Sequence, residues 1–445
     1  MTAESSARLA NRILIGLVVG ALAGGATLLA GQAAPGFLAA AQEFATLVLD
    51  PIGQVFLRML FFVVIPLVFA SLAMGIAQLD HLSTLGPLAV RTFVLFFLNM
   101  AIAVTLGLVM MNVIEPGAAM APEARAQLLE EYGGAAAQHV SKSAEQPDVT
   151  PMAIVEMFMP RNLFGAFVGN DRNRLGDVLP LILFAILVGA AAVKLREDRR
   201  EQLRSGLSLV TDLMTGIVHF ALRLAPYAVP AMIYSVVVKI GWDIVVALGL
   251  FVGGCILVML LHLFGTMSLW LRLLARRNPL ETFRLMRPVL VTAFSTSSSA
   301  ASLPTALAVA REDLGVRAPV AGFVLPLGTT MNMSGTALFE GCVVLFVAQV
   351  FGIELGMVQQ ATLVLLAVLS AVAVSAIPGG ALPLVAGLLA AFGIPPEGIG
   401  IILGVERLLD MTRTMVNVGS DVVTTVVVDR LTKLDGQPVR SGGHG

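Results

Sequence analysis

A stripe of charged and amide side chains runs along one predicted helix near the C-terminus. It consists of Glu406, Asp410, Arg413, Asn417 and Asp421, spaced by four, three, four and four residues. At about 100° per residue these positions fall within roughly 80° of one face of an α-helix. Each charge costs about 2.5–3.5 kcal/mol at the centre of a membrane helix, so the stripe should face something polar rather than lipid. The function of the chain should therefore be sought along this face.

Arg413 and Asp410 lie about one helical turn apart and offer complementary chemistry. A guanidinium binds a carboxylate through two parallel hydrogen bonds. A carboxylate accepts hydrogen bonds from an ammonium group. A zwitterion that carries a second carboxylate needs both groups, together with hydroxyl or amide donors. The alternative interpretation is a structural ion pair inside the membrane, since buried pairs also hold architecture.

The composition places this helix in a membrane protein. The chain has 445 residues, of which 57% are hydrophobic and 13% charged, with a mean hydropathy of +0.89. Soluble proteins have about 25% charged residues. Nearly uncharged windows of membrane-spanning length include 13–30, 244–264 and 357–394. We expect an all-α polytopic membrane protein, and no disulfide framework, because Cys255 and Cys342 both lie in apolar segments.

Charged loops predict the topology. Basic clusters at 194–204, 272–287 and 430–440 should be cytoplasmic, together with the N-terminus. The acidic segment 115–150 should lie outside. We interpret 13–30 as the first membrane helix and not as a signal peptide, because no cleavage site with a polar mature start follows it. The candidate spans up to the second basic cluster are 13–30, 46–78, 87–114, 152–194, 207–239 and 243–275.

Two later segments are apolar at both ends and broken in the middle. Segment 288–309 contains a serine run at 295–299, and segment 357–392 contains Ser-Ala-Ile-Pro-Gly-Gly at 375–380. Two short helices joined by a tight polar tip would use such residues well, so both are predicted to be re-entrant hairpins from opposite sides of the membrane. Between them, 318–350 is interrupted near 328–336. Repeated broken segments indicate an inverted repeat with a binding site at the midplane.

Four motifs in this order resemble the glutamate transporter family, the dicarboxylate/amino acid:cation symporters, in its bacterial form. They are the stretch 295–299 followed by Leu303-Pro304, the run 326–336, the tip 377–380 and the run 410–418. The resemblance covers most of the chain. It implies eight transmembrane helices plus two re-entrant helical hairpins, inverted repeats, a homotrimer and an elevator form of alternating access. It also implies a multi-pass protein of the bacterial inner membrane with both termini in the cytoplasm.

The resemblance also divides the chain into parts. Residues 1–114 would hold scaffold helices 1–3, with helix 3 partly in the transport domain. The extracellular loop would be 115–150, and 151–275 would hold scaffold helices 4–5 and transport helix 6. Residues 276–432 would form the transport core of hairpin 1, helix 7, hairpin 2 and helix 8, and 433–445 a cytoplasmic tail. No cofactor beyond coupling Na⁺ or H⁺ and no nucleic-acid partner is expected.

The resemblance gives roles to the polar stripe and to the two tips. Arg413 would bind the side-chain carboxylate of the substrate and Asp410 its amino group, which favours aspartate or glutamate. An arginine without a nearby acid would suit a C4-dicarboxylate, and an uncharged residue at 413 a neutral amino acid; both remain alternatives. The implied substrate-binding residues are Ser298, Ser299, Thr336, Ile377, Ala381, Asp410, Arg413, Thr414 and Asn417.

Cation sites follow from the same resemblance. The first sodium site would use Gly328, Asn332, Asn417 and Asp421, and the second Thr330, Met333, Ala371, Val372 and Val374, largely through backbone carbonyls. The third sodium site of the family is predicted to be lost here. Ser334 stands where that site has an aspartate, and Phe96, Asn99 and Met100 stand where it has hydroxyl ligands.

Glu340 is the predicted proton carrier. It lies one turn beyond Thr336 in an apolar stretch, and burial in such surroundings favours the protonated form of a carboxyl. In the family, this position holds the proton-accepting glutamate of proton-cotransporting members. The alternative is a glutamate paired with a cation. We expect coupling to protons, with fewer than three sodium ions or none. The role of Arg407 stays open.

Two other classes of protein are alternatives to a transporter. A channel also lines its pore with polar stripes, but paired tips from opposite sides favour an occluded site. A membrane enzyme is disfavoured, because the five histidines form no metal-binding spacing and no nucleophile motif is present.

Overall fold

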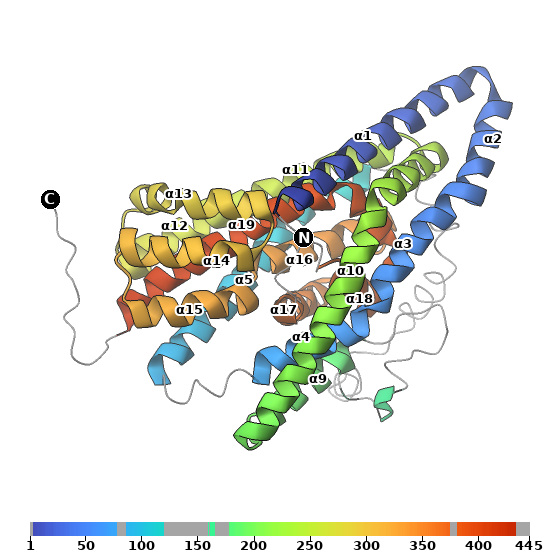
Figure 1. Ribbon diagram of the computed structural model, residues 1–445. Coiled ribbons are helices and arrows are strands. Elements are labelled where there is room, and N and C mark those ends of the chain that lie inside the picture. Colours follow the sequence, from blue (N-terminus) through green and yellow to red (C-terminus); the bar gives the residue numbers. More distant parts are fainter. Residues whose placement is uncertain are drawn as a thin grey trace.

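The computed structural model describes residues 3–77, 86–119, 159, 161–164, 178–373 and 381–432. These residues form helices joined by short connections, and no strand occurs among them (Figure 1). The described part of the chain therefore has the predicted all-α class.

The N-terminal elements form an elongated layer on one side of the molecule (Figure 1). Gly20 of α1 lies so close to α10 that a Cβ there would be 2.6 Å from the carbonyl oxygen of Pro230. Small residues at such contacts let two helices approach closely. The layer consists of α1 (Ala3–Ala33), α2 (Pro35–Phe44), η1 (Ala45–Leu49), α3 (Asp50–Phe62), α4 (Val64–Ala77), α9 (Val178–Ala192) and α10 (Glu197–Ile240).

An ion pair fastens α3 to α10 within this layer. Asp50 accepts hydrogen bonds from the hydroxyl of Ser235 and the ammonium of Lys239, both at 2.6 Å. The segment predicted as one span over 46–78 is divided at Val63, where α3 ends and α4 begins. The helix predicted over 207–239 begins ten residues earlier, at Glu197, because Glu197 and Asp198 in its first turn favour a helix N-terminus.

Two further helices pack against each other and against α16 (Ser334–Val350) and α19 (Ile399–Leu431). They are α5 (Gly86–Ile114), followed by η3 (Pro116–Ala119), and α11 (Asp243–Leu260), which continues through η4 (Leu261–Thr266), α12 (Met267–Trp270) and η5 (Leu271–Ala275). Cys255 of α11 and Cys342 are both buried free thiols, and neither forms a disulfide.

The first broken segment forms two helices with a sharp turn between them. α13 (Pro279–Thr296) ends where Ser297 adopts the left-handed conformation at φ 50°, and α14 (Ser299–Ala308), followed by η6 (Val309–Asp313), packs back against it. The predicted break within 295–299 is therefore present. The first helix begins at residue 279 instead of 288, because the side chain of Asn278 caps it by accepting from Leu280 N at 3.1 Å.

The remaining elements repeat this pattern of interrupted helices. α15 (Ala318–Met331) and α16 (Ser334–Val350) are separated at Asn332 and Met333, inside the predicted interruption. α17 (Met357–Ala373) and α18 (Leu382–Ala391) flank the predicted tip, of which residues 374–380 lie outside the described part of the chain. The 3₁₀ turn η7 (Pro396–Gly398) leads into α19 (Ile399–Leu431).

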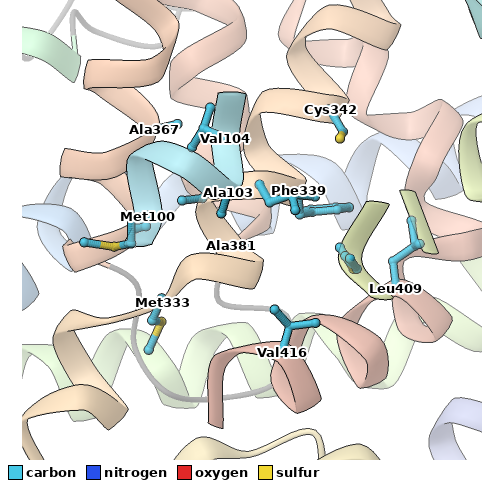
Figure 2. Close-up of a cluster of buried hydrophobic side chains, with 14 of the residues drawn as sticks. Met100, Ala103, Val104, Met333, Phe339, Cys342, Ala367, Ala381, Leu409 and Val416 are labelled. Atoms are coloured by element: carbon cyan, nitrogen blue, oxygen red, sulfur yellow. The ribbon is translucent and has the colours of Figure 1, made fainter. Parts of the chain in front are cut away.

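Helix α19 lies at the centre of these elements and contacts α11, α13, α15 and α16 (Figure 1). Every residue from 416 to 428 is buried. Figure 2 shows part of the surrounding core, where Met100, Ala103 and Val104 of α5 gather with Phe339 of α16 and Ala367 of α17. The predicted stripe therefore faces protein on all sides.

Four helical stretches among the described residues are long and apolar enough to cross a membrane. They are Ile15–Ala33, Pro87–Ile114, Asp243–Ala275 and Ala318–Val350. Their number agrees with a polytopic membrane protein. Helices α10 and α19 carry more charge, and in α19 this charge is turned inward.

Candidate binding site

The stripe on α19 is buried along its whole length. The exposed fractions of Glu406, Asp410, Arg413, Asn417 and Asp421 lie between 1% and 6%. Buried charges need partners, because an uncompensated charge in a low-dielectric interior is strongly destabilising. The site can thus be read from the partners that each group has.

Arg413 is the cationic centre of the site. Its Nη2 donates to Oδ1 of Asp410 and, at 3.2 Å, to Oε1 of Glu406. Its guanidinium carbon lies 4.8 Å above the ring centroid of Phe339, a cation–π distance. Nη1 is buried and has no hydrogen-bond partner. The site thus holds one cation with two carboxylates bound to one side of it, and one donor nitrogen remains for a further acceptor.

Asp410 and Arg413 form an ion pair with each other, which differs from the roles that the resemblance implies for them. The resemblance assigns the two residues to opposite ends of a substrate, whereas here they bind each other. Any incoming carboxylate would compete with Asp410 and Glu406 for the guanidinium. Both the substrate-binding and the structural interpretation of the pair agree with this geometry.

Asn417 caps a neighbouring helix. Its Oδ1 accepts from the backbone N–H groups of Gly335 at 2.7 Å and Thr336 at 3.2 Å, and its Nδ2 donates to the hydroxyl of Thr336 at 3.1 Å. The first N–H groups of a helix have no acceptor within that helix. Here Asn417 of α19 provides the acceptor for the first N–H groups of α16. Gly335 allows this approach, since a Cβ there would lie 2.5 Å from the carbonyl oxygen of Arg413.

The other predicted substrate residues lie around α19. Ser298 caps α14 by accepting from Ala301 N at 3.2 Å, and Ser299 is buried in the first turn of α14, which packs against α19. Thr414 and Ala381 are both buried. Ile377 lies outside the described residues, and the side chain of Arg407 is not among those described.

The residues of the first predicted cation site gather around Asp421. Its Oδ1 accepts from Asn332 Nδ2 at 2.9 Å, and Oδ2 is buried without a hydrogen-bond partner. The backbone of Gly328 lies against this carboxylate, since a Cβ there would be 2.5 Å from Oδ1. Hard cations prefer such oxygen ligands, so the donor set fits a small cation. Asn417, however, uses its oxygen on α16.

Asn99 joins this group from α5. Its Nδ2 donates to Oδ1 of Asn332 at 2.9 Å, and its own Oδ1 is buried without a hydrogen-bond partner. Sequence reasoning placed Asn99 in a lost site and missed this link to Asp421. The other residues at the predicted lost sodium site are Phe96, Met100 and Ser334. Phe96 and Met100 are buried apolar side chains, and the hydroxyl of Ser334 forms a hydrogen bond with the hydroxyl of Ser420 at 2.9 Å.

The second predicted cation site stays a prediction. Thr330 is exposed, and its hydroxyl donates to the carbonyl of Leu327 at 3.0 Å. Met333, Ala371 and Val372 are buried, and α15 packs against α17. Val374 lies outside the described residues.

Glu340 is fully buried in α16. Its Oε1 accepts from the hydroxyl of Ser370 in α17 at 3.1 Å, whereas Oε2 has no hydrogen-bond partner. Ser370 was missed by sequence reasoning, although a lone serine within an apolar helix could have drawn attention to it. The charge of Arg413 also acts on Glu340 through space.

The fold and this site define a helical membrane protein with a buried, charged binding centre built on an interrupted-helix core. The sequence profile of the Sodium:dicarboxylate symporter family matches residues 9–431, and the chain belongs to this family. A symporter family consists of transport proteins and not of enzymes.

Three relatives illustrate the range of the family. The chain is 29% identical over 425 residues to the "Proton/sodium-glutamate symport protein" of Bacillus subtilis (strain 168), covering 95% of this chain and 92% of that protein. It is 28% identical over 387 residues to the "Proton/glutamate-aspartate symporter" of Escherichia coli (strain K12), covering 85% and 84%. It is 28% identical over 387 residues to the "C4-dicarboxylate transport protein" of Deinococcus radiodurans, covering 86% and 83%.

Proposed function

We propose that the protein is a secondary active symporter that takes up acidic amino acids, aspartate or glutamate, with a cation gradient. The observation that carries this proposal is the buried Arg413 guanidinium, bound to two acids on its own helix and left with a donor nitrogen. Relatives named as glutamate and glutamate-aspartate symporters support the same substrate class.

Substrate binding would exchange partners within the ion pair. The side-chain carboxylate of the substrate would bind Arg413 and replace its contact with Asp410. Asp410 would then accept from the substrate ammonium, so that each buried charge keeps a partner throughout. Thr414, Thr336 and the serine tip at Ser298 and Ser299 would supply further donors, and the second tip, with Ile377 and Ala381, would close over the substrate.

The coupling ion is proposed to be the proton, with or without sodium. Glu340 is buried, accepts a hydrogen bond from Ser370 and would carry the proton. Asp421, Asn332 and Gly328, with Asn417 beside them, offer the oxygens for a sodium ion. Two of the relatives are named as proton/sodium-glutamate symport proteins, which agrees with either ion.

The architecture proposed for transport is eight transmembrane helices and two re-entrant hairpins in inverted repeats. Residues 276–432 would slide as a transport core against the scaffold helices of 1–114 and 151–275 in an elevator motion. We propose a homotrimer in the inner membrane, with the loop 115–150 outside and the tail 433–445 in the cytoplasm. Two helix pairs support the two hairpins: α13–α14, with its turn at Ser297, and α17–α18, whose described residues pack against each other.

Reconstituted protein tests the substrate and the coupling ion together. Proteoliposomes with separately imposed sodium and proton gradients should accumulate radiolabelled aspartate against its own gradient. An inward proton gradient should drive this accumulation, and Glu340→Gln should abolish that dependence. Uptake that equilibrates without accumulation would indicate a channel, and accumulation that ignores the proton gradient would remove the role of Glu340.

A C4-dicarboxylate is the second candidate substrate, because a relative of similar identity is named as its transporter. The carboxylate of Asp410 beside Arg413 disfavours it, since a dicarboxylate brings no ammonium to offset that charge. A competition panel of aspartate, glutamate, succinate and serine separates the candidates. Stronger competition by succinate than by aspartate would overturn the amino acid assignment.

A further inference from the structure

The carboxyl of Glu340 is held from a different helix by a single neutral donor. Ser370 Oγ donates to Oε1 at 3.1 Å, and the exposed fractions of the two residues are 0% and 1%. The carboxyl therefore exchanges no hydrogen bond with bulk water at this oxygen. Its geometry depends on where α17 places Ser370.

Helix α17 is anchored so that Ser370 keeps its place. Near the N-terminal end of α17, Asn112 Nδ2 donates to Oε1 of Gln360 at 2.8 Å, and Gln360 Nε2 donates back to Oδ1 of Asn112 at 3.4 Å. Ser370 lies ten residues further along, in the last turn before residues 374–380. The amide pair fixes one end of the helix, and the bond to Glu340 fixes the end next to the predicted tip.

The charged groups around Glu340 come from α19. Arg413 reaches it electrostatically, with Glu406 and Asp410 bound to the guanidinium, and Asp421 lies two turns further along α19. The described parts of α17 and α18 contain no ionisable side chain. In the other helices packed on α16, the ionisable residues are Arg91 of α5, and Asp243 and Cys255 of α11.

The immediate surroundings on the α5 side are apolar. Val104 and Leu108 lie beside Gly341, the residue after Glu340, where a Cβ would be 2.9 Å from Val104 Cγ1 and 3.5 Å from Leu108 Cδ2. Arg91 lies 13 residues before Val104 on α5, a separation of about 20 Å along a helix axis. Ser370 is consequently the hydrogen-bond donor to the carboxyl, and Arg413 is the cation that acts on it through space.

We propose that Ser370 is the positioning residue for Glu340, and that it couples the protonation of this carboxyl to the first helix of the second hairpin. The inference rests on the proposed function of Glu340 as proton carrier. A donor to a carboxylate favours its charged form, so Ser370 promotes release of the proton. Movement of α17 away from Glu340 would remove the donor, and the carboxyl would then retain its proton. Proton loading and the position of the hairpin would thus change together.

The pH dependence of uptake tests this proposal. Aspartate uptake into proteoliposomes is measured between pH 5 and pH 9 for the wild type, Ser370→Ala, Ser370→Thr and Glu340→Gln. Ser370→Ala should shift the alkaline midpoint of uptake upward by roughly one pH unit, because it removes one hydrogen bond to a charged group. Ser370→Thr keeps the hydroxyl and should restore the wild-type midpoint. Glu340→Gln should give a flat profile.

A hydroxyl elsewhere on the same helix is the matched control. Thr362 of α17 is partly exposed, and its hydroxyl donates to the carbonyl of Val358 on its own helix at 2.9 Å. Thr362→Ala should leave the midpoint unchanged. If Ser370→Ala does not fold, Ser370→Cys provides a weaker donor of similar size and should give a smaller shift in the same direction.

The outcomes separate this inference from the proposed function. A Ser370→Ala profile that superimposes on the wild type, while Glu340→Gln is flat, overturns the role of Ser370 and leaves Glu340 as proton carrier. A Glu340→Gln profile with wild-type pH dependence overturns both. A shift in Ser370→Ala that Ser370→Thr does not reverse would point to packing and would also overturn the proposal.

Discussion

The guanidinium of Arg413 binds the carboxylate of Asp410 across one turn of α19, and Glu406 accepts from the same nitrogen. The three side chains are nearly inaccessible to solvent. Their charges do not cancel, because two carboxylates face one cation. A substrate that brings both a carboxylate and an ammonium can enter this set and leave every charge with a partner.

Replacing Arg413 should therefore change which substrates bind. In Arg413→Cys, aspartate uptake should fall by roughly 10–100-fold, because hydrogen bonds to charged groups contribute about 1.5–3 kcal/mol. Neutral amino acids should begin to compete, since the site no longer requires a side-chain carboxylate. Competition assays in proteoliposomes measure both effects. Arg272→Cys, at an exposed arginine, is the control and should behave as the wild type. Unchanged aspartate uptake in Arg413→Cys would sink the assignment.

The bond network of Asn417 predicts a stability effect. Asn417→Ala leaves the N–H groups of Gly335 and Thr336 without their acceptor, and a buried unsatisfied donor costs about 1–3 kcal/mol. The thermal midpoint of the detergent-solubilised protein should fall. Asn417→Asp keeps an acceptor beside the helix N-terminus, where negative charge is favourable, and should lose less. Equal midpoints for the two variants would show that the capping bonds are unimportant.

The sequence predicted the stripe on α19 because all of its members lie on one helix, where spacing fixes the face. It also predicted a break within 295–299, which the structure places at Ser297, because a run of serines before a proline is poorly suited to a continuous helix. It could not predict partners across helices. Asn99 and Asn332 are 233 residues apart, and Ser370 reaches Glu340 from another element. Such pairs depend on tertiary packing, which no local pattern encodes.

The same limit explains the pairing inside the stripe. Asp410 lies three residues and Glu406 seven residues before Arg413 on the same face of α19, and the sequence offers no reason for both to share one nitrogen. The assignment of Asn417 to a substrate or sodium site missed its cap on α16 for a related reason. A cap contributed by a different helix has no sequence spacing to reveal it.

Glu397, in the connection between α18 and α19, should make stability depend on pH. Burial raises the pKa of this carboxyl above its ordinary value, although its own backbone bond acts in the opposite direction. A carboxyl whose pKa is higher in the folded state favours folding at acidic pH, and this contribution is lost as the pH rises through the folded-state pKa. Glu397→Gln should thus raise the thermal midpoint relative to the wild type at pH 8, and this advantage should shrink at pH 4.

The control for this prediction is Glu354, an exposed glutamate in the connection between α16 and α17. Glu354→Gln should leave the thermal midpoint close to that of the wild type, because an exposed side chain changes its hydration little on folding. A Glu397→Gln midpoint that follows the wild type at every pH would contradict the prediction.

Gly328 lies against Asp421, so alanine variants at two glycines of α15 can test the predicted cation site. A Cβ at Gly328 would lie 2.5 Å from Oδ1 of Asp421 and displace the carboxylate, whereas a Cβ at Gly322 meets open space. A ligand that binds only the folded state stabilises it, by about 1.4 kcal/mol at a concentration tenfold above its dissociation constant. Sodium chloride should therefore raise the thermal midpoint of the wild type and of Gly322→Ala relative to choline chloride. It should have no such effect on Gly328→Ala. A full sodium effect in Gly328→Ala would place the ion away from Asp421, and the absence of any effect in the wild type would leave the proton as the coupling ion.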